Sequence, residues 1–188
     1  MSARGLLAYV MGPSGAGKDT LLAGARAVLD PSVWVFAHRY ITRPPMPEDE
    51  NFMSLSPAEF DARREAGLFA FHWRAREVDY GIGAEIETWR ARGLAVVVSG
   101  SRADWRTGAP ACAGAVPVLI TAPPELLAAR LATRGRDPDI ERRLARADEF
   151  AIDAPDTIRI DNAGTVAEGV AAFVATLNAL RTRNVAAA

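Results

Sequence analysis

The sequence predicts an α/β protein with a mainly parallel sheet and helices packed on both of its faces. Short apolar runs alternate along the chain with helical segments, a pattern typical of parallel strands joined by crossover helices. The first apolar run also leads into a glycine-rich turn that ends in a lysine, and a helical segment follows. The 188 residues are therefore expected to form one domain that carries small inserted lobes.

The expected strands are short and apolar. The runs at residues 6–11 and 94–98 are apolar throughout, as buried strands of a parallel sheet require, and the second is largely β-branched. The other expected strands cover residues 33–37, 68–73, 116–121 and 157–160. The segment Tyr80-Gly81-Ile82-Gly83 is expected to form a turn before the next helix.

Two of the expected helices carry clear boundaries. Ser56-Pro57-Ala58-Glu59 is a capping box with proline at the first helical position, so a helix begins there and runs to about residue 66. Gly93 ends a second helix, at residues 84–92. A poorly defined helix, limited by Pro110, is expected before residue 116. The remaining expected helices cover residues 19–29, 125–134, 140–152 and 166–181.

The composition is that of an ordinary soluble globular protein. Apolar residues make up 49% of the chain and charged residues 24%, and the net charge of −1 gives no attraction to nucleic acid or to a membrane surface. The single cysteine, Cys112, excludes an internal disulfide and favours a reducing, cytoplasmic location. The composition does not specify an oligomeric state.

The glycine-rich turn has the features of a phosphate-binding loop. It reads G-x-x-x-x-G-K between an expected strand and an expected helix, so the chain is expected to be a P-loop NTPase. Its glycines let several backbone N–H groups point into one concavity, while Lys18 reaches the terminal phosphates of a nucleotide. The residues expected to bind ATP here are Gly12, Pro13, Ser14, Gly15, Ala16, Gly17, Lys18, Asp19 and Thr20.

The residue after the lysine departs from the usual loop. Serine or threonine normally stands there and coordinates Mg²⁺, whereas this chain has Asp19. Thr20 cannot replace it, because one helical step rotates a side chain by about 100°. Mg²⁺ prefers oxygen ligands and keeps several waters, so Asp19 is expected to bind the metal directly or through water.

Other polar segments should converge at the edge of the sheet where the phosphate loop lies. Ligands of parallel sheets bind beyond the carboxyl ends of the strands. Arg39 and Arg43 follow a strand and could clamp a second anionic group. The further residues expected on the substrate are Tyr80, Ser99, Ser101 and Arg102. For His72, within an apolar strand, a structural role is the simpler interpretation.

Arginines gather between residues 130 and 146. Arg134 and Arg136 lie in a glycine-containing loop that can move, as a lid over a migrating phosphoryl group must. One of Arg142, Arg143 and Arg146 is expected to join them, with Arg143 as the catalytic choice. A solvated basic face is the alternative interpretation for Arg130, Arg142 and Arg146.

Several of these motifs resemble those of the guanylate kinase family. The similar segments are Gly12–Lys18, Ile41-Thr42-Arg43-Pro44-Pro45, Tyr80-Gly81, and Arg130–Asp137 with Arg142-Arg143-Leu144. The resemblance implies a core of about residues 1–40 and 84–188, an acceptor-binding lobe of about 41–83 and a lid of about 134–146. By the same analogy, adenine lies near the lid, and Arg130 and Asn162 contact the nucleotide.

The base-reading residues of guanylate kinases are absent. Asn51, His72 and Ser99-Gly100-Ser101 stand where that family has a tyrosine, a glutamate and an aspartate. The chain instead resembles a sister family, the ribose 1,5-bisphosphate phosphokinases. The segments that carry this resemblance are Gly17-Lys18-Asp19, Arg39–Pro44, Glu50-Asn51, Tyr80–Ile86 and Val97–Ala103.

The resemblance implies a specific reaction. That family makes 5-phosphoribosyl 1-diphosphate from ribose 1,5-bisphosphate and ATP during phosphonate breakdown. Asn51 and His72 would then be specificity residues at the substrate. Two alternatives stay open: a nucleoside monophosphate kinase with altered base recognition, and a kinase-like binding module that Asp19 has made catalytically silent.

Overall fold

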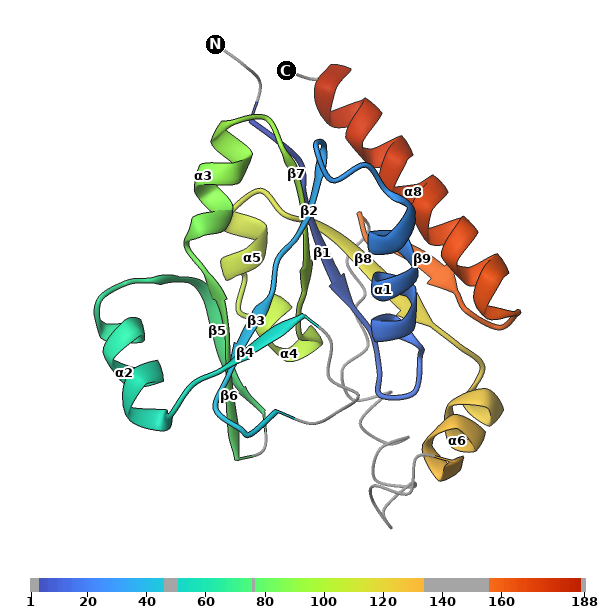
Figure 1. Cartoon of the computed structure of the whole chain (residues 1–188). Helices are drawn as coiled ribbons and strands as arrows, with labels where there is room; N and C mark the ends of the chain where they lie inside the picture. Colours follow the sequence, from blue (N-terminus) through green and yellow to red (C-terminus); the bar gives the residue numbers. More distant parts are fainter. Residues whose placement is uncertain (1–3, 46–50, 76, 134–155, 187–188) are drawn as a thin grey trace.

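The computed structural model describes residues 4–45, 51–75, 77–133 and 156–186, which form two sheets and their covering helices (Figure 1). The main sheet has five parallel strands in the order β2-β7-β1-β8-β9. These strands are β1 (Leu7–Met11), β2 (Trp34–Phe36), β7 (Ala95–Ser99), β8 (Val116–Thr121) and β9 (Ile158–Asp161). The predicted parallel α/β sheet is confirmed.

Helices cover both faces of the main sheet. α1 (Lys18–Val28) and α8 (Val166–Ala186) pack together on one face, while α3 (Glu85–Ala91) and the short α4 (Arg102–Trp105) and α5 (Ala109–Cys112) lie on the other (Figure 1). α6 (Pro124–Thr133) follows β8. Within the described parts of the chain, no helix combines the length and apolarity needed to cross a membrane.

The central strand β1 supplies both cores. Ala8 and Val10 face the cluster under α1 and α8, which includes Phe173 and Leu177. The alternate residues Leu7, Tyr9 and Met11 face the cluster under α3. All five residues of β1 are buried, which accounts for an apolar run without polar alternation. β1 therefore holds the loop that follows it rigidly in place.

A second sheet lies beside the main one. Its order is β4-β3-β6-β5, with strands β3 (Arg39–Ile41), β4 (Phe52–Ser54), β5 (Phe69–Ala75) and β6 (Val78–Gly83). α2 (Pro57–Glu65) packs against it and begins as predicted, with the Ser56 hydroxyl accepting the Glu59 N–H at 3.1 Å. Phe71 and Ile82 join the α3-side core, so the two sheets share one apolar interior.

The expected turn at residues 80–83 is wrong, because this segment lies in strand β6. Its glycines serve close packing. A Cβ on Gly81 would lie 2.7 Å from the Phe69 ring, and one on Gly83 would collide with the Glu85 carboxylate. The short strands β3 and β4 were also missed, because they form only by pairing with each other and with β6.

Pro110 does not limit a helix. It lies in the first turn of α5, where backbone N–H groups make no intrahelical bonds, so proline's lack of an N–H costs none. Gly108, with φ of 81°, separates α5 from α4, so the expected single helix is two short ones. The helix expected at residues 140–152 lies outside the described residues.

Candidate functional site

The phosphate loop joins the carboxyl end of β1 to the start of α1. Gly15 and Gly17 have φ of 88° and 84°, values that favour glycine and that turn successive N–H groups into the loop. A Cβ on Gly12 would lie 2.6 Å from the Ile120 carbonyl oxygen, so the loop passes close against β8. The backbone therefore has the form of an anion-binding concavity at a helix N-terminus.

Lys18 reaches from this loop to the neighbouring strand. Its Nζ donates to Ser99 Oγ at 2.5 Å and to Asp19 Oδ1 at 2.7 Å. Burial lowers the pKa of Lys18; the Asp19 carboxylate opposes this shift and the Arg39 guanidinium adds to it. An incoming phosphate would supply the charge that favours the ammonium form.

Asp19 links the two sheets electrostatically. The same Oδ1 that contacts Lys18 lies 3.9 Å from the guanidinium of Arg39, on β3 of the second sheet. One carboxylate oxygen is thus held between a cation of the phosphate loop and a cation of the second sheet. The point between the two cations therefore favours negative charge.

The carboxylate of Asp19 also fits a magnesium ion. The Asp19 side chain is 64% exposed at the mouth of the phosphate loop. Among the described residues, no three His, Cys, Asp or Glu side chains gather to hold a metal. A single carboxylate, with phosphate oxygens and waters as the other ligands, is a usual arrangement for Mg²⁺. The exposed carboxylate of Asp19 fits this arrangement, and its binding of Mg²⁺ stays a prediction.

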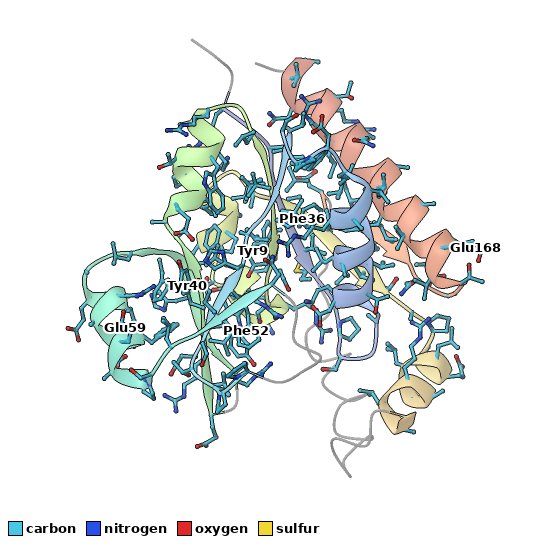
Figure 2. The ribbon with its side chains drawn as sticks, in the orientation of Figure 1. Tyr9, Phe36, Tyr40, Phe52, Glu59 and Glu168 are labelled. Carbon is cyan, nitrogen blue, oxygen red and sulfur yellow. The ribbon has the colours of Figure 1, made fainter. Side chains whose placement is uncertain are left out.

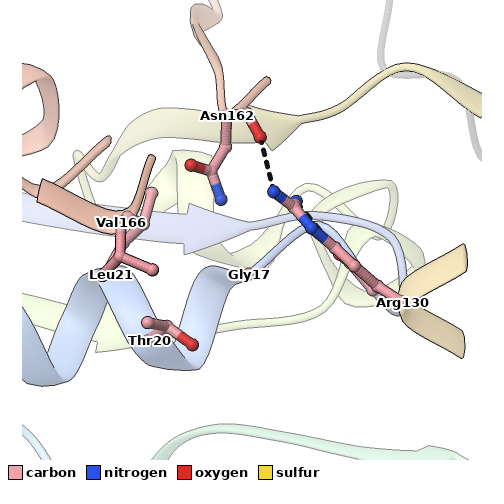
Figure 3. A pocket seen from close by; sticks show the side chains of 7 residues that line it. Gly17, Thr20, Leu21, Arg130, Asn162 and Val166 are labelled. Atoms are coloured by element: carbon pink, nitrogen blue, oxygen red, sulfur yellow. Dashed lines mark hydrogen bonds between the residues drawn. The ribbon is translucent and has the colours of Figure 1, made fainter. Parts of the chain in front are cut away.

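Arg130 and Asn162 support the phosphate loop from outside. The buried Asn162 side chain donates from Nδ2 to the Ala16 carbonyl at 2.8 Å. Arg130 donates to the Asn162 carbonyl at 3.1 Å, the contact drawn as a dashed line in Figure 3, and to the Gly15 carbonyl at 3.5 Å. Both residues hold the backbone that would hold the phosphates.

A cavity opens beside this support. Its volume is about 290 Å³, and Figure 3 shows Thr20, Arg130 and Asn162 around it. The remaining lining residues are Gly15, Gly17, Leu21 and Val166. The cavity adjoins the phosphate loop, beside the two residues that the family resemblance predicts on the nucleotide.

The residues predicted on the acceptor do not all gather at the site. Ser99 contacts Lys18, and Arg39 approaches Asp19. By contrast, Arg43 donates to the Pro44 carbonyl at 3.1 Å and lies over the Phe52 ring, while Tyr80 stacks on Trp73. These two side chains form part of the second sheet's surface.

Asn51 and His72 have different surroundings. The Asn51 amide donates to the Phe36 and Ala37 carbonyls, each at 3.1 Å, and its own φ is 53°. It thereby joins the end of β2 to the second sheet, and a contact with substrate stays a prediction. His72 is exposed on β5, and its predicted contact with substrate also stays a prediction.

Ser101 and Arg102 follow β7 and start α4. The Ser101 N–H donates to the hydroxyl of Tyr9 at 3.0 Å, and burial lowers the pKa of Arg102. Sequence reasoning missed Tyr9 and its partner Asp104; the one available signal was a tyrosine within an otherwise aliphatic central strand. The predicted lid residues Arg134, Arg136 and Arg143, with Arg142 and Arg146, lie outside the described residues.

Comparison with known proteins identifies the family. Ribose 1,5-bisphosphate phosphokinase PhnN of Desulfomicrobium baculatum is 48% identical over 165 residues, a match that covers 86% of this chain and 88% of that protein. The chain belongs to the ribose 1,5-bisphosphate phosphokinase family. The phosphokinase of the same name from Chromobacterium violaceum is 52% identical over 149 residues, which cover 78% of this chain and 80% of that one.

Solved structures agree on the fold. A guanylate kinase from Anaplasma phagocytophilum superimposes with a TM-score of 0.68 over 96% of this chain and 88% of that one, at 16% identity. This likeness confirms the guanylate kinase-like architecture of the phosphokinase and concerns the fold alone. No protein-family profile matches the chain.

Proposed function

We propose that this phosphokinase transfers the γ-phosphoryl group of ATP to the 1-phosphate of ribose 1,5-bisphosphate, giving 5-phospho-α-D-ribose 1-diphosphate and ADP. The observation that carries the proposal is the Asp19 oxygen held 2.7 Å from Lys18 Nζ and 3.9 Å from the Arg39 guanidinium. It marks a position for negative charge between the donor and acceptor sides. Family membership supplies the identity of the sugar.

On the donor side, the loop amides of residues 12–18 and the Lys18 ammonium would bind the ATP phosphates. Arg130 and Asn162 would keep the loop in shape, through their bonds to Gly15 and Ala16. Bound Mg²⁺ would neutralise charge on those phosphates, and Asp19 would hold it directly or through water. Incoming phosphates would repel the Asp19 carboxylate from its present place between two cations. The carboxylate would then be available to bind Mg²⁺.

On the acceptor side, a sugar with two phosphates needs cations and hydroxyl-binding groups rather than a slot for a purine. Arg39 and Arg102 would supply charge near the phosphate loop, and Ser99 and Ser101 would supply hydroxyls. Arg43 and Tyr80 would act farther out, on the second sheet. The lid arginines Arg134, Arg136 and Arg143 would close over the transferring group and exclude water.

The chemistry needs no strong general base. The attacking atom is an oxygen of the sugar's 1-phosphate, which is already anionic at neutral pH. It forms a bond to the γ-phosphorus as the bond from that phosphorus to the β–γ bridging oxygen breaks, and ADP leaves. Catalysis then consists of positioning and of neutralising charge, which is what Lys18 and the arginines provide. We place the reaction in the cytoplasm and in phosphonate breakdown.

A coupled assay of ADP formation with Mg²⁺ tests the proposal. We expect turnover with ribose 1,5-bisphosphate, little with GMP, and loss of turnover in Lys18→Ala. Faster turnover of GMP than of the sugar would indicate a nucleoside monophosphate kinase instead. ATP binding without turnover on either acceptor would favour the silent binding module.

A further inference from the structure

A buried hydroxyl–carboxylate pair lies beneath the acceptor side of the site. Tyr9, in the middle of β1, is fully buried, and Asp104, on α4, is 6% exposed. The Tyr9 hydroxyl and Asp104 Oδ2 are 2.6 Å apart. Figure 2 shows Tyr9 near the centre of the molecule, and its ring meets Phe71 of the second sheet edge-on at 5.8 Å.

The Tyr9 hydroxyl donates one hydrogen bond and accepts another. The 2.6 Å distance to a carboxylate is that of a charge-assisted bond, so Tyr9 donates to Asp104. The same oxygen then accepts the Ser101 N–H at 3.0 Å. Burial raises the pKa of Tyr9, with the Asp104 carboxylate adding to the shift, so the phenol keeps its proton.

The bond to Ser101 fixes one end of a short segment whose other end touches the phosphate loop. Ser99 Oγ accepts from Lys18 Nζ at 2.5 Å, while Ser101 is held by Tyr9. Between them, a Cβ on Gly100 would lie 2.5 Å from the Tyr9 hydroxyl oxygen and nearer still to the ring. The backbone at Gly100 and Ser101 thus packs directly against the Tyr9 side chain.

We propose that Tyr9 and Asp104 are positioning residues, which set the placement of the Ser99–Arg102 segment against the phosphate loop and so determine affinity for the acceptor's phosphate. The inference rests on the proposed function for the identity of that acceptor. Packing alone does not explain the pair, because phenylalanine would fill the same space. The hydroxyl adds an acceptor for the Ser101 N–H, and the Asp104 carboxylate directs the hydroxyl's own proton away from that bond.

The test compares Tyr9→Phe, Asp104→Leu and Asp104→Asn. Tyr9→Phe and Asp104→Leu break the chain of bonds, and we expect KM for ribose 1,5-bisphosphate to rise about tenfold or more, while the Kd for ADP changes less than about twofold. Asp104→Asn keeps an oxygen that can accept from Tyr9, so it should stay near the wild-type KM. Phe173→Leu, buried on the opposite face of the main sheet, is the control for general loss of stability.

Hydrogen exchange gives a readout that does not need turnover. In Tyr9→Phe, amides at residues 99–106 should exchange faster while those of β1 stay protected. If wild type fails to use the sugar, the proposed function fails, and this exchange pattern still decides the inference. Unchanged exchange at residues 99–106 would overturn the inference. So would a lower melting temperature without a change in KM for the acceptor, the result expected of Phe173→Leu. Equal losses of affinity for ADP and for the acceptor in Tyr9→Phe or Asp104→Leu would overturn it as well.

Discussion

Replacing Asn162 by alanine tests how the phosphate loop is held. The Asn162 amide donates to the Ala16 carbonyl at 2.8 Å, and both residues are buried. The replacement removes the donor and leaves that carbonyl without its bond. Because the Ala16 carbonyl lies in the loop itself, the loss should loosen the curved backbone whose N–H groups would face the phosphates.

The size of the effect follows from this one bond. Leaving a buried carbonyl unsatisfied costs about 1–3 kcal/mol. If the whole cost appeared in phosphate binding, affinity would fall about 5- to 150-fold, at roughly 1.4 kcal/mol per factor of ten. The part that instead lowers stability should reduce the melting temperature by about 2–4 °C per kcal/mol for a chain of this size.

The assay measures, by calorimetry, the affinities of wild type and Asn162→Ala for ATP and for inorganic tripolyphosphate. If Asn162 supports the loop, both ligands should lose affinity by the same factor, since tripolyphosphate has the phosphates and no base. If Asn162 instead contacts adenine, only ATP should weaken. Asn178→Ala, an exposed asparagine on α8, is the matched control and should change neither value.

Two results would refute the reasoning. One is a Kd for tripolyphosphate within about twofold of wild type in Asn162→Ala, with an unchanged melting temperature. The other is a selective loss of ATP affinity, which would make Asn162 an adenine contact as the family analogy implied.

Three further predictions concern the same loop and its neighbour. Asp19→Asn should raise the Mg²⁺ concentration for half-maximal activity severalfold and tighten ATP binding without metal, because a carboxylate no longer competes for Lys18; an unchanged Mg²⁺ titration would contradict this role. Burial lowers the pKa of Lys18, so kcat/KM for ATP should fall with rising pH earlier than an exposed lysine would allow, as the free enzyme's ammonium loses its proton; a flat profile up to the pH of unfolding would exclude this. Gly100→Ala should cost about 1–3 kcal/mol of stability and raise KM for the acceptor, because its methyl group would meet the Tyr9 ring; wild-type thermal unfolding and KM would argue against that contact.

The main sheet could be predicted because its strands depend on local pattern. β1 and β7 are apolar throughout, and the phosphate loop follows β1 with characteristic spacing. The capping box at Ser56 likewise acts within one turn of helix. In these segments the residues that determine the structure are adjacent in the chain, so the sequence alone contains the information.

The second sheet and the support of the site depend on contacts between distant residues. β6 contains two glycines and resembles a turn until Phe69 and Glu85 are seen packed against them. Tyr9 and Asp104 are 95 residues apart in the sequence and meet only in the folded protein. Asn162 could be placed near the nucleotide by family resemblance, but its bond to Ala16, 146 residues away, has no local signature.

Phosphorus NMR of the complete reaction tests the central claim most directly. Ribose 1,5-bisphosphate, ATP and Mg²⁺ are incubated with wild type, with Lys18→Ala as the control. The account predicts that the sugar's 1-phosphate resonance is replaced by the coupled pair of a diphosphate, one for each ADP formed, while its 5-phosphate resonance keeps its monoester shift. An unchanged sugar alongside released inorganic phosphate, or a diphosphate formed only when GMP replaces the sugar, would contradict it.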